Sequence, residues 1–275
     1  MKTICDETLT FITPTFLSGA DQNVPEVRAS SVRGAWRWWF RALGGSLEEE
    51  REVFGGVHEV TTASAVIVRV KMLEQKFGDD IRFSPTSDKG YVYFFAAKSG
   101  NDKGVHRTEA RHYLDAGSSF RLLVQLRREL SDELEQMLRK SLEAFLTLGA
   151  LGLRASRGCG AFVCGHPRSQ DEFSHYCRTL PSNVLVRLVG DPMDQAVKCQ
   201  EALAATLRQL RKDSHKSGKD RSAFGFSFGK ERESSALRLR PICVEEGILP
   251  VVVYCDAACD QPSVADFVLA ATTAV

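Results

Sequence analysis

One segment, residues 30–45, constrains the fold of this chain more than any other. Its sequence, SSVRGAWRWWFRALGG, contains no proline, opens with two serines that can cap a helix and closes with two glycines that can stop one. At 3.6 residues per turn, the large apolar side chains fall on one face of this helix: Val32, Trp36, Trp39, Phe40 and Leu43. The pattern therefore predicts an amphipathic helix that packs on a core through aromatic side chains.

Three arginines form a stripe beside the apolar face of that helix. Arg33, Arg37 and Arg41 recur every four residues, and like charges at this spacing repel one another. Residues 27–47 contain no acidic side chain that would offset them. An indole beside guanidinium groups suits a stacked base, and Trp38 is expected roughly opposite the apolar face. We therefore expect this helix to bind a polyanion.

The net charge of the chain limits where a polyanion can bind. The 275 residues carry a formal net charge of +1, so any attraction must come from local basic patches. Residues 28–41 contain four arginines, residues 154–168 contain three arginines and one histidine, and residues 208–221 contain six lysines and arginines against two aspartates. Because Arg28 opens the first patch, we include it among the candidate contacts.

A second candidate site is the glycine-rich segment at residues 149–160. Glycines let backbone N–H groups approach phosphates closely, and flanking arginines add charge-assisted hydrogen bonds. The segment is not a P-loop, because it lacks the G-K-[ST] sequence, and a tight connection between a helix and a strand explains the glycines equally well. The arginines favour the phosphate interpretation, and the candidate contacts are Gly152, Arg154, Arg157, Gly158 and Gly160.

The pattern along the rest of the chain predicts an α+β protein, and 43% hydrophobic residues are enough for a sizeable core. Apolar runs predict strands over residues 2–13, 65–72, 91–97, 119–127, 184–189 and 249–255, and amphipathic stretches predict helices over residues 131–149, 193–211 and 263–271. The order of these elements is consistent with a split βαβ, ferredoxin-like sheet. We therefore expect two ferredoxin-like (RRM-like) domains in tandem, over residues 1–167 and 182–275.

The eight cysteines show no metal-binding pattern. None forms a C-x-x-C pair, and the tightest spacings, Cys159 to Cys164 and Cys255 to Cys259, lack a matching set of histidines. We therefore expect neither a metal nor a cofactor. The first residues lack a secretory hydrophobic region and no apolar run approaches membrane-spanning length, so we expect a cytoplasmic protein with reduced thiols and no membrane contact.

Four motifs follow one another in a specific order: TPTFLSGAD, SVRGAWRWWFRALGG, EVFGG and LGALGLRASRGCGAF. Together they resemble the RAMP superfamily of CRISPR proteins, and most closely its members at the head of the type III-B (Cmr) effector complex. The likeness covers residues 7–165 well and is weaker beyond, where SALRLRP resembles the second domain of those proteins.

The resemblance implies two ferredoxin-like domains and membership of an antiviral ribonucleoprotein that captures complementary RNA. Its partners would be guide RNA, target RNA and the other subunits of a type III effector complex, with contact near the 3′ end of the guide. In that family the helix matching residues 33–41 and the loop matching residues 152–160 line the RNA-facing cleft. The expected function is therefore RNA binding without catalysis.

Two alternatives remain open at this point. Related RAMP proteins cut RNA, so the chain could be an endoribonuclease that processes guide RNA; its candidate residues would be His106, His112 and Asp21, although none lies in a recognisable catalytic setting. The chain could also be a purely structural adaptor whose basic patches meet acidic partner subunits. The acidic residues 48–52 would then offer a second docking surface.

Overall fold

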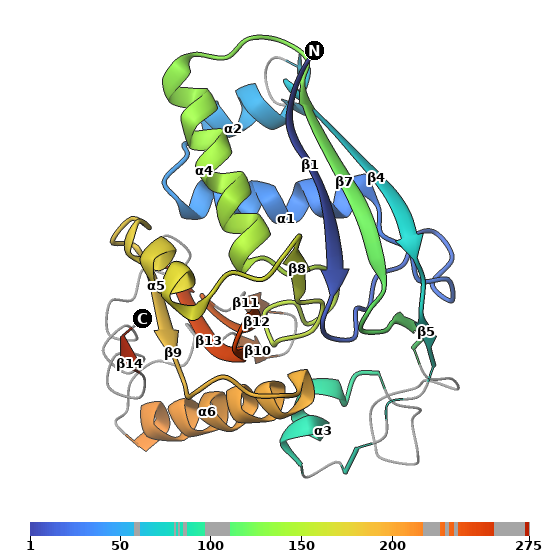
Figure 1. Cartoon of the computed structure of the whole chain (residues 1–275), viewed down its shortest axis with the longest axis vertical. Helices are drawn as coiled ribbons and strands as arrows, with labels where there is room; N and C mark the ends of the chain where they lie inside the picture. The colour runs from blue at the N-terminus through green and yellow to red at the C-terminus, as the bar shows by residue number, and fades with distance from the viewer. Residues whose placement is uncertain are drawn as a thin grey trace.

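The computed structural model contains two four-stranded antiparallel sheets with helices packed against them (Figure 1). It describes residues 1–57, 61–79, 81, 83–84, 87–96, 111–216, 226–228, 231–233, 236–255 and 273–274. The elements of the first half are β1 (Lys2–Phe11), α1 (Ala29–Ala42), α2 (Leu47–Phe54), β2 (Gly56–Val57), β3 (Thr61–Thr62), β4 (Val66–Glu74), β5 (Phe77–Gly78), α3 (Asp88–Tyr93), β6 (Tyr113–Leu114), β7 (Ser119–Leu126), α4 (Asp132–Leu148) and β8 (Phe162–Cys164).

The elements of the second half are α5 (Gln170–Arg178), β9 (Val184–Leu188), α6 (Ala196–Lys216), β10 (Phe226–Phe228), β11 (Glu231–Glu233), β12 (Leu237–Val244), β13 (Gly247–Cys255) and β14 (Thr273–Ala274). The first sheet has the strand order β4-β7-β1-β8 and the second has the order β12-β13-β9-β14. In each sheet the first strand along the chain lies between the third and the fourth. The predicted α+β class is therefore confirmed.

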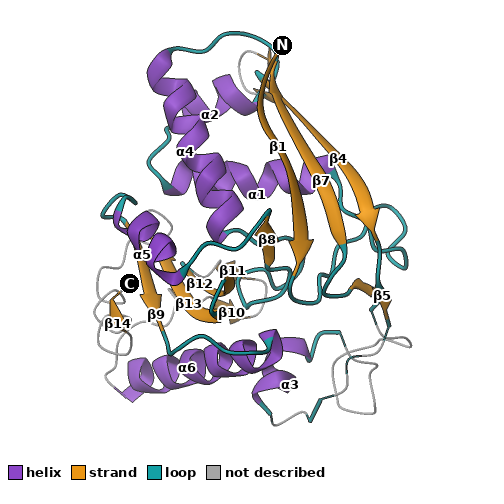
Figure 2. Cartoon of the chain, in the orientation of Figure 1, coloured by secondary structure: helices purple, strands orange, loops and turns teal. Residues whose placement is uncertain are grey.

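The first sheet buries one face under helices. Figure 2 shows α1, α2 and α4 on the same side of β1, β7 and β4. Strand β7 confirms the strand predicted at residues 119–127, and it alternates, because Phe120, Leu122, Val124 and Leu126 are buried while Arg121 between them is exposed. A half-buried antiparallel sheet requires this alternation, and it was visible in the sequence.

Helix α1 confirms the predicted apolar face and the predicted end. Val32, Trp36 and Phe40 are almost completely buried, and the indole N–H of Trp36 donates a hydrogen bond to the hydroxyl of Ser141 in α4 at 2.9 Å. Gly44 adopts a φ of +102°, and the N–H groups of the two glycines donate back to the carbonyls of Arg41 and Phe40, which is a Schellman ending. The expected serine cap is wrong, because the N-cap residue is Arg28 and it makes no side-chain capping bond.

The predicted strand at residues 91–97 is also wrong. Residues 91–93 belong to α3 and residues 94–96 form a turn. Helix α3 begins after Ser87, whose hydroxyl accepts a hydrogen bond from the N–H of Gly90 at 2.9 Å. The helix buries Val92 and Tyr93, and the hydroxyl of Tyr93 donates to the side chain of Gln200 in α6 at 2.6 Å. A short apolar run does not distinguish a strand from a buried helix, and here the cap and the packing against α6 decide.

The segment expected to connect two domains, between residues 167 and 182, contains helix α5. Its Phe173 and Tyr176 are buried in an apolar core that includes residues of both sheets, among them Leu9 and Val251. The domain limits at residues 167 and 182 stay a prediction. The helix expected at residues 263–271 lies outside the described residues, and no described helix is long and apolar enough to span a bilayer.

Candidate functional site

Segments that are far apart in the sequence meet around a pocket of about 240 Å³. The loop between β1 and α1, the start of α1, the residues before β6 and the glycine-rich loop after α4 all contribute to it. The lining residues that carry polar or exposed groups are Ser18, Gln22, Arg28, Ser31, Arg111, His112, Gly152 and Leu153. Of the residues predicted from the sequence, the pocket brings together Arg28 and Gly152.

The walls of this pocket are held by backbone hydrogen bonds. Thr15 and Leu114 pair through both of their peptide groups, at 2.8 and 3.0 Å, and this places Arg111 and His112 beside the loop before α1. The N–H of Leu153 donates to the carbonyl of Phe16 at 2.9 Å. Arg111 and Arg28 are separated by more than eighty residues in the sequence, and this bridge helps to bring both to the lining of one pocket.

Gly152 is required by the close approach of the glycine-rich loop to the wall of the pocket. Its φ is +89°, and a Cβ atom there would lie 2.6 Å from the carbonyl oxygen of Phe16. Gly160 has a similar requirement, because its φ is +66° and a Cβ atom would lie 1.8 Å from the carbonyl oxygen of Leu151. Gly158, at φ +87°, has more space around it. These glycines therefore shape the loop itself.

The pocket carries positive potential at the start of α1. Arg28 is exposed, and its only ion pair among the described residues is a solvent-exposed one with Glu26 at 3.5 Å, which neutralises it weakly. The first turn of α1 contains no acidic residue and no side-chain cap, and although the N–H of Ser31 donates to the carbonyl of Arg28 at 3.0 Å, the positive end of the helix dipole still attracts an anion. Arg28, Arg111 and this helix end together suit a phosphate group.

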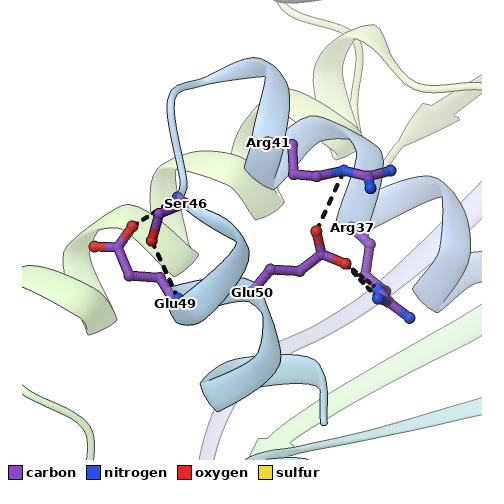
Figure 3. A network of polar contacts seen from close by, with 5 residues as sticks. All are labelled: Arg37, Arg41, Ser46, Glu49 and Glu50. Carbon is purple, nitrogen blue, oxygen red and sulfur yellow. Dashed lines mark hydrogen bonds and ion pairs between the residues drawn. The ribbon is translucent and has the colours of Figure 1, made fainter. Parts of the chain in front are cut away.

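The acid that offsets the arginine stripe of α1 comes from another helix. Glu50 of α2 has a side chain that is 4% exposed, and one carboxylate oxygen accepts from Nε of Arg37 at 2.7 Å while the other lies 3.3 Å from Nε of Arg41 (Figure 3). The capping box between Ser46 and Glu49 begins α2 in front of Glu50. The expectation that these arginines lack an offsetting acid is therefore wrong. No ion pair of Arg33 with a described residue is present, so Arg33 remains the free cation of the stripe.

Trp38 lies at the contact between the two halves of the chain. The guanidinium carbon of Arg238, on β12, lies 3.4 Å from the centroid of the Trp38 ring, and Trp39 packs edge-on at 5.0 Å. One face of the ring is thus covered by Arg238. The expected open stacking surface is wrong for that face.

The two arginines of the glycine-rich loop bind protein groups. Arg157 is 6% exposed and donates to the carbonyl of Leu237 at 3.5 Å, and burial lowers its pKa to about 10. Arg154 has a φ of +59°, donates to the carbonyl of Tyr91 at 2.8 Å and lies 4.9 Å from the ring centroid of Phe94. Burial also lowers the pKa of Arg154. Both side chains hold the loop against α3 and β12, and this geometry argues against direct phosphate contact by either.

Sequence reasoning missed Arg111 as a contact residue and considered His112 only for catalysis. The other nuclease candidates do not join them. Asp21 is exposed and caps a local turn by accepting from the N–H of Asn23 at 2.9 Å, and His106 lies outside the described residues. No group of three or more possible metal ligands occurs in the described part of the chain.

The fold and the site together define a two-sheet α+β protein whose basic pocket, beside a glycine-rich loop, suits a phosphate-bearing ligand. The chain belongs to the RAMP superfamily, whose family model matches residues 8–163. The matched region holds the end of β1, helix α1, both arginines of the pocket and the glycine-rich loop. The family expected from the sequence motifs is therefore confirmed.

Two relatives come from Pyrococcus furiosus. The CRISPR system Cmr subunit Cmr1-1 is 33% identical over 146 residues, which are 50% of this chain and 40% of that protein. The CRISPR system Cmr subunit Cmr1-2 is 32% identical over 172 residues, which are 54% of this chain and 89% of that protein. The match to Cmr1-1 thus spans less than half of that protein's length.

Solved structures share the fold. The apo form of Cmr1 from Pyrococcus furiosus has a TM-score of 0.61 at 24% identity, over 91% of this chain and 87% of that chain. A chain of the type III-B Cmr-beta complex bound to cognate target RNA has a TM-score of 0.55 at 13% identity, over 93% and 94% of the two chains. At these identities the likeness supports the architecture of both sheets.

Proposed function

We propose that this chain is a non-catalytic, RNA-binding subunit of a type III-B CRISPR effector complex, in contact with guide or target RNA near the 3′ end of the guide. The observation that carries the proposal is the pocket in which Arg28, Arg111 and the start of α1 meet the glycine-rich loop. Two relatives of this chain are named Cmr subunits, and one structure of similar fold is a Cmr complex bound to target RNA. Both support the proposal.

We also propose that the two sheets are two ferredoxin-like domains in tandem. The support is their common strand order, in which the first strand lies between the third and the fourth. The domain limits of this proposal remain residues 1–167 and 182–275.

In the proposed binding mode the pocket receives one phosphate and its neighbouring sugar. Arg28 and Arg111 donate to phosphate oxygens, and the positive end of α1 adds a favourable field. The side chains of Ser31 and Gln22 supply the donors and acceptors that a ribose 2′-hydroxyl needs. Leu153 is 46% exposed and offers an apolar contact to a base.

The test is fluorescence anisotropy of the purified chain with a labelled single-stranded RNA across a salt series. Each phosphate contact adds about 0.7 to the log–log salt slope for single strands, so replacing Arg28 and Arg111 by glutamine should flatten it by about 1.4. Arg178→Gln, an exposed arginine on α5 outside the pocket, is the matched control and should leave the slope unchanged. An unchanged slope and affinity in the double variant would contradict the proposal.

One observation keeps the nuclease alternative in view: His112 lines the same pocket as the two arginines. A histidine beside cations can assist attack of a 2′-hydroxyl on the adjacent phosphate. Denaturing gels of the RNA from the same samples, with and without divalent metal, distinguish the two functions. Intact RNA supports binding alone, whereas fragments that disappear in His112→Ala would establish cleavage. If the chain does not bind RNA even at low salt, the alternative of a purely structural adaptor is favoured.

A further inference from the structure

A second hollow, of about 530 Å³, lies between α4, β1, β8, α5 and β12. Its walls include the apolar side chains of Leu142, Leu146, Phe162, Phe173 and Ile242. No candidate RNA-contacting residue is part of its lining. We call this hollow the β1 groove. It is therefore a surface feature that the proposed RNA site does not explain.

One side of the β1 groove is an open edge of the first sheet. Strand β1 pairs with β7 from Lys2 to Thr10, but it pairs with β8 only over its last three residues. The N–H of Gly165 makes one further bond to the carbonyl of Thr8 at 3.0 Å, and a φ of +62° at Gly165 then turns the chain away. From Glu7 back to Lys2, no strand in the described part of the chain pairs with this edge.

The peptide groups of β1 that face the groove can be assigned. Successive residues of an antiparallel strand direct their N–H and C=O groups to opposite sides. The carbonyl of Thr8 accepts from Gly165 on the groove side, and the N–H of Phe11 donates to Ser118 on the β7 side. The pairing with β7 is regular from Cys5 to Thr10, so the N–H and C=O of Asp6 point to the same side as those of Thr8. The open edge therefore offers a donor and an acceptor at Asp6 that no strand in the described part of the chain uses.

We propose that the β1 groove binds an extended segment of another protein subunit of the effector complex, added as a strand along the open edge of β1. The inference rests on the proposed function, because it takes the partner from that complex. An extended peptide matches the repeat of the edge peptide groups, and its alternate side chains would enter the apolar groove. RNA offers no such ladder of N–H and C=O groups.

The charges of the groove favour the same kind of occupant. Glu143 already pairs with Arg168 at 3.0 Å, and Arg139 pairs with Glu135 at 2.7 Å. Glu7 is exposed and makes no ion pair with a described residue. A phosphate backbone would be repelled by the carboxylates of Glu7 and Glu143. The segment that fits carries apolar residues at alternate positions and a lysine or arginine opposite Glu7.

The experiment compares hydrogen exchange of the free chain with that of the chain assembled with the other type III-B subunits. Exchange of the amide of Asp6 should slow by about tenfold or more on assembly, because the edge becomes paired, whereas the amides of Cys5 and Glu7, which face β7, should change little. Asp6→Pro removes the free N–H and should weaken assembly by about tenfold relative to Asp6→Ala, which keeps that N–H. Both variants lose the pair between Asp6 and Arg121, so the alanine variant is the matched control.

Glu7→Lys is the second variant and leaves the backbone intact. It should also weaken assembly, while its RNA affinity and melting temperature stay those of the parent chain. Assembly without slower exchange, or equal assembly of Asp6→Pro and Asp6→Ala, overturns the inference alone. If RNA alone slows the exchange, RNA occupies the groove and the inference is overturned. If exchange slows when the chain forms a dimer, seen by sedimentation, a second copy of the chain occupies the groove and the inference is again overturned. Failure to assemble at all contradicts the proposed function and the inference together.

Discussion

Glu50 is the residue that most changes the interpretation of α1. Its buried carboxylate lies between Arg37 and Arg41 and holds both guanidinium groups on the protein (Figure 3). The two arginines are more than a third exposed, so their outer N–H groups still face solvent. Glu50 thus sets how much positive charge the helix presents to a ligand.

Glu50→Gln should lower the stability of the fold and raise its affinity for RNA. The amide removes the charge that pairs with two arginines, so we expect a loss of about 1–3 kcal/mol in the free energy of unfolding, measured by urea titration. The freed arginines should tighten RNA binding in the anisotropy assay. Glu52→Gln, which breaks an exposed pair with Arg128, should change stability by less than about 0.5 kcal/mol. Weaker RNA binding by Glu50→Gln would contradict this role.

At the scale of elements, hydrogen bonds from Arg240 of β12 join the glycine-rich loop to the end of α4. Arg240 is 1% exposed, and its Nε donates to the carbonyl of Leu148 at 2.6 Å. Its Nη1 donates to the carbonyls of Leu239, at 3.0 Å, and of Ala155. The carbonyl end of α4 carries partial negative charge and offsets the buried cation. The second sheet therefore holds the loop whose Gly152 and Leu153 line the pocket proposed to bind RNA.

Arg240→Met should loosen that loop without changing any of the proposed RNA-contacting residues. Two buried carbonyls, of Leu148 and Ala155, would lose their donor, so we expect a loss of about 2–4 kcal/mol in the free energy of unfolding. Amides of residues 149–160 should exchange faster, and RNA affinity should fall while the salt slope stays near that of the parent. Arg128→Met, at an exposed position, is the control. Unchanged hydrogen exchange of the loop amides would show that Arg240 does not hold the loop.

At the scale of the whole molecule, buried thiols should make the free energy of unfolding fall at alkaline pH. Burial raises the pKa of the Cys199 and Cys255 thiols from 9.0 to about 12. Above pH 9 the unfolded chain therefore loses thiol protons that the folded chain keeps. The stabilisation is fully present below pH 9 and is lost as the pH rises toward 12.

Cys199→Ala should reduce this alkaline loss. The free energy of unfolding of the parent should fall more steeply between pH 9 and about pH 11, by up to about 1.4 kcal/mol per pH unit for the one thiol. Urea titrations at several pH values measure the two slopes. The comparison uses slopes because the cavity left by the substitution adds a constant cost at every pH. Equal slopes would show that Cys199 does not contribute to the loss of stability at alkaline pH.

The sequence by itself determined the elements with strong local signals. The buried face and glycine ending of α1 were predictable, and so were the Ser131 cap of α4 and the alternation of β7. Each depends on residues within a few turns or pleats, where periodicity and capping chemistry act directly. The motif order in residues 8–163 also sufficed to predict the family.

The tertiary structure alone decided which charges face a ligand. It paired Glu50 with the stripe of α1, buried Arg157 under β12 and brought Arg111 beside Arg28. It also made α3 a helix by packing it on α6. These outcomes depend on strand register and on contacts between segments tens of residues apart, and local propensity carries no information about such contacts. The pocket therefore depends on how the first half of the chain folds, whereas the Arg240 contacts and the β1 groove depend on packing the two sheets together.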